Sequence, residues 1–228
     1  MAQAQSQLSS LYLDLFSRFI KSTNEKIKAF DDISDLEGAS EEVLTELIEL
    51  LNLYIKNCSG ELNATANKAM FFAALKNYKL NFLKSSDLEF VDFDNVLEIY
   101  RLSDFKQVYR NFAFFKLSTF SLLDLVQRPL NELFSRNEEV EKSVIDLFMS
   151  SSSLTRAQKI TNVSKHLIKE KFRNHRQVFM YEPNYITPLS DGTSPEGRPT
   201  HILLSGNVQM YEMKPLVAES QSENQIQI

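Results

Sequence analysis

Apolar residues recur every three or four positions through the first third of the chain, which is the spacing of one helical face. The pattern predicts amphipathic helices over about residues 9–30, 41–57 and 62–83. Ser40 can cap the second helix, and Glu41 and Glu42 follow it where acids favour the helix dipole. Because three helices make a thin core, we expect this unit to pack against a partner copy or the rest of the chain.

The pattern changes after Ser85 and Ser86. Alternating apolar and polar residues on both sides of Ser103 and Asp104 predict a β-hairpin. Short helices are then expected at 111–117, 121–126 and 129–134, a longer helix at 137–149, and strands at 177–189 and 200–213, the last with a hairpin about Gly206 as an alternative. Residues 156–173 fit both a helix and a strand, and we expect a helix early and a strand late.

This order of elements predicts an α+β protein. We expect a helical dimerisation unit over residues 1–85, an antiparallel sheet with flanking helices over 86–216, and a disordered polar tail over 217–228. With 17 Phe and no Trp, the core must be rich in Phe, and only 5 Gly argue against a sandwich with many tight turns.

The net charge of −5 is unevenly distributed. Every charged residue between Asp31 and Glu49 is acidic, whereas one later stretch is strongly basic. The cations of this basic run are Arg156, Lys159, Lys165, Lys169, Lys171, Arg173 and Arg176. The acidic and basic stretches fit two solvated faces or a contact between them, and the basic run also fits a phosphate-binding patch. An alternative function is nucleic-acid binding through the basic run.

Cysteine use and hydropathy indicate a cytoplasmic protein. Cys58 is the only cysteine, so no internal disulfide can form. The N-terminal residues have neither a basic region nor an apolar region typical of a signal peptide, and no stretch is apolar for long enough to span a membrane. We therefore expect no membrane association.

The motifs of common enzyme classes do not appear in the sequence. The five glycines are isolated, so no phosphate-binding loop is present, and there is no Gly-x-Ser-x-Gly elbow, kinase signature or His-Glu-x-x-His. His166, His175 and His201 are not spaced as metal ligands. We expect no catalytic activity. An enzyme of another kind would reveal itself by a deep polar pocket in which titratable groups converge.

Residues 108–134 resemble the PAS domain family. Asn111 and Ala113 follow the second expected strand, Ser118-Thr119-Phe120-Ser121 supplies the turn, Leu122 to Leu125 the next helix, and Arg128-Pro129-Leu130 the following step. The resemblance extends over about residues 96–212, because strands, short helices, a longer helix and closing strands follow one another in that order. PAS domains hold a small ligand between sheet and helices, or dimerise and pass a conformational change to a neighbour.

The resemblance implies a regulatory, ligand-sensing or protein-interaction module that forms a homodimer and acts on a separate signalling protein. A small apolar ligand would occupy a pocket lined by Phe115, Phe120, Leu123, Leu133, Ile145, Phe148 and Leu203, unless these residues are plain core. Neither haem nor flavin is expected. Residues 130–153 contain no His to ligate haem, and Cys58 lies outside the sensor region.

Overall fold

The computed structural model describes residues 2–23, 36, 39–58, 62–120, 122–171, 177–194 and 197–211. Its N-terminal part contains the helices α1 (Ala2–Ser22), α3 (Glu41–Asn57) and α4 (Ala64–Asn77). The α3 helix begins as predicted, with the Ser40 side chain accepting a hydrogen bond from the Val43 amide. The α1 helix starts earlier than predicted, and its expected end near residue 30 lies outside the described residues.

The prediction that the third helix continues to residue 83 is wrong. The α4 helix ends at Asn77, and Lys79 adopts a left-handed backbone with φ of 55°. The Leu80 amide then donates to the Leu75 carbonyl at 2.8 Å, which closes the helix end. Asn81–Phe82 form a short strand, β1, that pairs with β7 (Val178–Ser190), so the sheet begins before residue 85.

The hairpin and the short helices form where the sequence predicted them. Strands β2 (Val96–Arg101) and β3 (Gln107–Arg110) pair antiparallel, with Glu98 opposite Arg110. The elements that follow are α5 (Phe112–Phe115), α6 (Leu122–Gln127), α7 (Leu130–Leu133), β4 (Phe134–Ser135) and α8 (Glu138–Ser150). Two 3₁₀ helices, Ser85–Phe90 and Ser151–Ser153, join neighbouring elements.

The expected helix in the early part of residues 156–173 is not formed. Two strands lie there instead, β5 (Gln158–Lys159) and β6 (His166–Glu170), so the late strand is confirmed. Along β6, buried and exposed residues alternate, because β6 pairs with β7 and presents one face to the core. The helix-like spacing of Ile160 and Val163 reflects two buried contacts made from a loop.

The strands form one antiparallel sheet in the order β3-β2-β8-β7-β6-β4, with β8 spanning His201–Met210. Both β1 and β5 also pair with β7. The alternative of a hairpin about Gly206 is not realised, since β8 runs straight through it. A Cβ at Gly206 would lie 2.8 Å from the Glu182 carbonyl oxygen, so glycine permits the close approach of the two strands.

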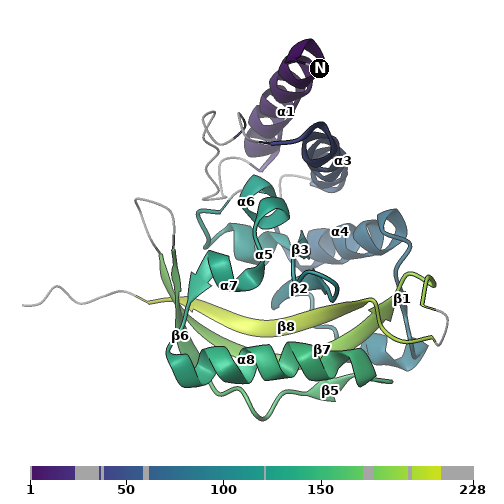
Figure 1. Ribbon diagram of the computed structural model, residues 1–228, viewed down its shortest axis with the longest axis vertical. Coiled ribbons are helices and arrows are strands. Elements are labelled where there is room, and N and C mark those ends of the chain that lie inside the picture. The colour runs from purple at the N-terminus through teal and green to yellow at the C-terminus, as the bar shows by residue number, and fades with distance from the viewer. Residues whose placement is uncertain are drawn as a thin grey trace, which may run out of the picture.

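Helices cover both faces of the sheet. Tyr100 of β2 packs against Phe148 of α8, with ring centroids 5.2 Å apart. Tyr109, opposite Ile99, packs instead against Phe71 of α4 at 5.9 Å. In Figure 1, α8 crosses the sheet beside β7 and β8, whereas α1 and α3 stand at one end of the molecule.

An aromatic cluster joins the N-terminal helices to the rest of the chain. Tyr54 of α3 contacts Phe19, Phe112 and Phe115 at 5.3–5.7 Å between ring centroids. Its hydroxyl donates to the Arg110 carbonyl and accepts from the Arg110 amide at 3.1 Å. The helices therefore pack against the rest of the chain, and their buried residues belong to the same core as those of the sheet.

Among the described residues, none of the helices combines the length and the apolar character that crossing a membrane requires.

Candidate functional site

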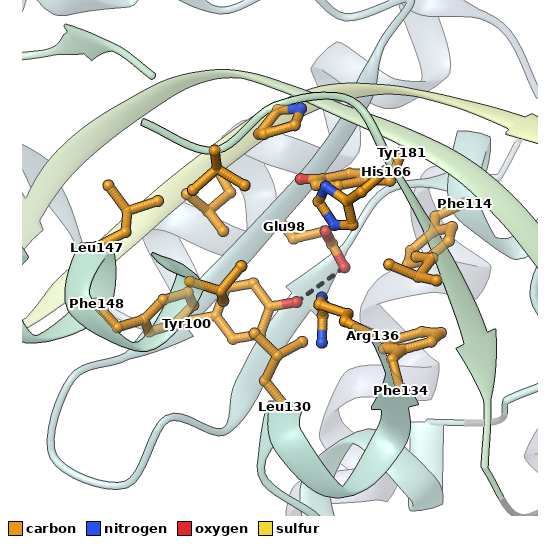
Figure 2. Close-up of a pocket in the computed structure, with 15 residues that line it drawn as sticks. Glu98, Tyr100, Phe114, Leu130, Phe134, Arg136, Leu147, Phe148, His166 and Tyr181 are labelled. Carbon is orange, nitrogen blue, oxygen red and sulfur yellow. Dashed lines mark hydrogen bonds between the residues drawn. The ribbon is translucent and has the colours of Figure 1, made fainter. Parts of the chain in front are cut away.

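A pocket lies between the sheet and the helices α7 and α8 (Figure 2). Side chains alternate between the two faces along each strand. The pocket face of the sheet therefore carries Glu98 and Tyr100 of β2, Leu204 of β8, Tyr181 of β7 and His166 of β6. Leu130 of α7 and Leu147 and Phe148 of α8 lie opposite them. This inner pocket has a volume of about 30 Å³, which is the space of about one water molecule.

Four polar residues of the hairpin form a buried hydrogen-bonded cluster at one wall of the inner pocket. The Tyr100 hydroxyl donates to Glu98 Oε1 at 3.0 Å (Figure 2), and Gln107 Nε2 also donates to that oxygen. Arg110 Nε donates to Gln107 Oε1 at 2.9 Å. Glu98 and Arg110 lie on adjacent strands, so antiparallel pairing brings the carboxylate and the guanidinium together.

Burial dominates the electrostatics of this cluster. It raises the pKa of Glu98, and the nearby Arg110, Gln107 and Tyr100 partly oppose that rise by favouring the carboxylate. Burial likewise lowers the pKa of Arg110. Arg110 Nη2 lies 4.0 Å from Glu98 Oε1, and the guanidinium lies over the Phe114 ring with 3.9 Å between its carbon and the ring centroid. The charge of Glu98 thus has a buried counter-charge beside it.

Arg136 is the second buried cation of the site. It follows β4, and its side chain is only 5% exposed. Its Nη1 lies 3.7 Å from Glu141 Oε2, too far for a hydrogen bond. Its Nε and Nη1 atoms are buried and form no hydrogen bond within the described part of the chain. In Figure 2 the guanidinium reaches toward the Glu98 carboxylate and the Tyr100 hydroxyl.

His166 faces the same pocket as a neutral base. Its Nδ1 lies 2.7 Å from the Ser164 carbonyl oxygen, which can only accept, so Nδ1 carries the proton. Its Nε2 is then an acceptor, and it has no hydrogen-bond partner among the described residues. Burial lowers the pKa of His166, and the charge of Arg136 lowers it further. Its ring packs edge-on against Tyr181, whose pKa burial raises.

A wider groove between α7, α8 and Phe105 adjoins the inner pocket. This outer groove has a volume of about 240 Å³ and is lined by Phe105, Leu130, Asn131, Arg136, Glu141, Val144, Ile145 and Phe148. It shares Leu130, Arg136, Val144 and Phe148 with the inner pocket. Arg136 therefore stands between a mostly apolar groove that a small molecule could enter and a buried polar cluster.

Two of the seven residues expected to line a ligand pocket contact these cavities. Phe148 lines both, and Ile145, which is 48% exposed, lines the outer groove. Phe115, Phe120, Leu123, Leu133 and Leu203 are buried and line neither cavity. Leu203 projects to the other face of the sheet, and its neighbour Leu204 lines the inner pocket, because successive residues of a strand alternate between faces.

The five described cations of the basic run are spread along β5, β6 and the residues next to them. Lys159 lies opposite Tyr185 and Lys169 opposite Val178, seven residues apart on β7, or about 23 Å at ~3.3 Å per residue. Lys165 lies 3.9 Å from Glu182. Arg156 is exposed, and Lys171 donates to the Asn131 carbonyl. Arg173 and Arg176 lie outside the described residues.

The polar residues of the pocket were missed by sequence reasoning. Glu98 and Tyr100 lie in the stretch that predicted β2. The available signal was a glutamate between the apolar residues Leu97 and Ile99. Arg136, His166 and Tyr181 have no local signal, since only the folded sheet brings them together. No family model, curated protein or solved structure matches this chain, so its function is argued from this geometry.

Proposed function

We propose that this chain is a cytoplasmic, PAS-like regulatory module that binds a small molecule in the outer groove and acts on a separate output protein. The observation that carries the proposal is the groove itself, a 240 Å³ space between helices that leads to the buried Arg136. The PAS family holds its ligands between sheet and helices. The order of strands, short helices, a longer helix and closing strands is further support.

The position of α8 supports a regulatory role. One side of α8 lines the groove through Val144, Ile145 and Phe148, and Phe148 also packs on Tyr100 of the sheet. Met149 on the same helix is 63% exposed, so α8 also presents surface to solvent. A ligand that fills the groove would shift α8 against the sheet. The output protein would detect this shift at the exposed surface of α8.

We propose that the titratable groups of the inner pocket serve in ligand binding and do not catalyse a reaction. The Oε1 atom of Glu98 already accepts hydrogen bonds from Tyr100 and Gln107. A space of about 30 Å³ admits a water-sized molecule and not a substrate beside that carboxylate. A general base must lie within hydrogen-bond reach of the proton that it removes. A molecule larger than water cannot come that close to Glu98 in this space.

The test is native mass spectrometry of the full chain after incubation with a metabolite extract. We expect a bound small molecule on the wild-type protein and its loss in Ile145→Trp, because the indole would fill the groove from a half-exposed position. Met149→Trp is the matched control. It places the same side chain one turn away, outside the groove, and should keep the bound mass. A wild-type protein that binds nothing, or equal binding by Ile145→Trp, would contradict the proposal.

A further inference from the structure

We propose that the ligand of the outer groove is a small organic anion with an apolar tail, such as a short-chain carboxylate, and that Arg136 binds its anionic head. This inference rests on the proposed ligand-sensing function and adds the chemical class of the ligand. It is argued from the hydrogen-bonding state of Arg136, the charges around it, and the size and lining of the groove.

The hydrogen-bonding capacity of Arg136 is only partly used. A guanidinium carries five N–H donors in a planar fork that matches a carboxylate. The Arg136 side chain is only 5% exposed, yet its buried Nε and Nη1 atoms make no hydrogen bond to the described residues. Buried donors without a partner are costly, so an acceptor that reached them would bind favourably.

The surrounding charges favour an anion as that acceptor. The buried carboxylate nearest to the site, Glu98, is already compensated by Arg110 and by two hydrogen-bond donors. Glu141 lies 3.7 Å from Arg136, but its side chain is 29% exposed at the rim of the groove. Glu141 therefore holds Arg136 weakly, and it can turn to solvent when a ligand carboxylate takes its place. A cationic ligand would instead meet the charge of Arg136.

The size and the lining of the groove limit the rest of the ligand. At about 30 Å³ for each water-sized unit, a volume of 240 Å³ holds roughly eight non-hydrogen atoms. Most of the lining is apolar, including Phe105, Leu130, Val144, Ile145 and Phe148. Hexanoate has a size and a polarity that fit this space, with the carboxylate on Arg136 and the alkyl chain along the groove.

The experiment is isothermal titration calorimetry of the full chain with hexanoate, 1-hexanol and hexylamine as probes. We expect hexanoate to bind at least about tenfold more tightly than the other two, because a charge-assisted hydrogen bond is worth that ratio or more. Equal or tighter binding of hexanol or hexylamine would overturn the anionic class while leaving a ligand-sensing function standing. Failure of all three probes to bind would overturn this inference, and a wild-type protein that also lacks a bound mass after metabolite incubation would overturn both.

Three substitutions test the role of Arg136 itself. Arg136→Gln should weaken hexanoate binding by about tenfold or more, with thermal unfolding as the check that the variant folds. Glu141→Gln lies at the rim and should bind hexanoate several-fold more tightly, since the competing carboxylate is gone. Glu139→Gln is the matched control, because it removes the same charge from the first turn of α8 without lining the groove, and it should bind as the wild type does. Unchanged binding in both Arg136→Gln and Glu141→Gln would overturn the proposal.

Discussion

At the scale of single residues, Glu170 shows how one buried carboxylate holds distant segments together. It is fully buried and accepts hydrogen bonds from Ser118 Oγ at 2.7 Å, from the Thr119 amide at 2.8 Å and from Thr119 Oγ1 at 2.6 Å. The Gln177 amide donates to it at 3.1 Å. Glu170 therefore ties the turn after α5 to the ends of β6 and β7.

We expect Glu170→Gln to lower the free energy of unfolding by about 1–3 kcal/mol, because the amide nitrogen would face donors and leave a buried group without a partner. Urea unfolding followed by circular dichroism measures this. The control is Glu182→Gln, whose side chain is 48% exposed and lies 3.9 Å from Lys165, and which should change stability by less than about 0.5 kcal/mol. Equal effects of the two substitutions would contradict the role given to Glu170.

At the scale of elements, the end of α4 decides where the helical region stops and the sheet begins. The Lys79 amide donates to the Lys76 carbonyl at 3.2 Å and the Leu80 amide to the Leu75 carbonyl at 2.8 Å, the pattern of a Schellman motif. Leu75 and Leu80 are both buried, which adds the usual apolar contact. This motif favours glycine at the left-handed position, where this chain has Lys79.

Lys79→Gly should therefore stabilise the protein by about 0.5–1 kcal/mol, because the left-handed backbone strains a residue with a Cβ and not a glycine. The midpoint of thermal or urea unfolding measures the gain. Lys76→Gly is the matched control within the same helix end. Lys76 is exposed and helical, so glycine there should cost about 1 kcal/mol. A loss of stability in both variants would argue against strain at Lys79.

At the scale of the whole molecule, the helical region and the sheet are not independent bodies. Phe19 of α1 contacts Phe115 with ring centroids 5.8 Å apart, and Asn67 of α4 donates to the Phe93 carbonyl at 2.8 Å. Asn67 Oδ1 also accepts from the Phe112 amide at 3.0 Å. We infer that a change in the sheet region can reach α1 and α3 through this junction.

We expect the full chain to form a homodimer through α1, whose Leu11 is 46% exposed on a helix that stands at one end of the molecule (Figure 1). Leu11→Glu should then give a monomer in size-exclusion chromatography with light scattering, because a charge would be buried in the interface. Leu167→Glu on β6 makes the same substitution at a residue of similar exposure, 42%, and should leave the dimer intact. A monomeric wild-type protein would show the dimer prediction to be wrong.

Most of the helices and strands, and their order, could be predicted from local sequence patterns. Ser40 caps α3 as predicted, the longer helix begins next to Asn137 where its pattern placed it, and the alternation around Ser103 and Asp104 predicted the hairpin. These signals are local, because a cap or a strand face is specified by residues within a few positions of one another. The helix predicted early in residues 156–173 failed, since β5 exists only through its pairing with β7.

The residues of the site could not be predicted in this way, because they meet only in the folded chain. Glu98, Arg136 and His166 come from separate parts of the chain, and the sheet brings them to one pocket. The PAS resemblance implied a pocket that included Phe148 and Ile145, which do line the cavities, but it also named Leu203, whereas the neighbouring Leu204 faces the inner pocket. The apolar pattern marks what is buried, whereas the register of each strand determines which buried side chain faces the cavity.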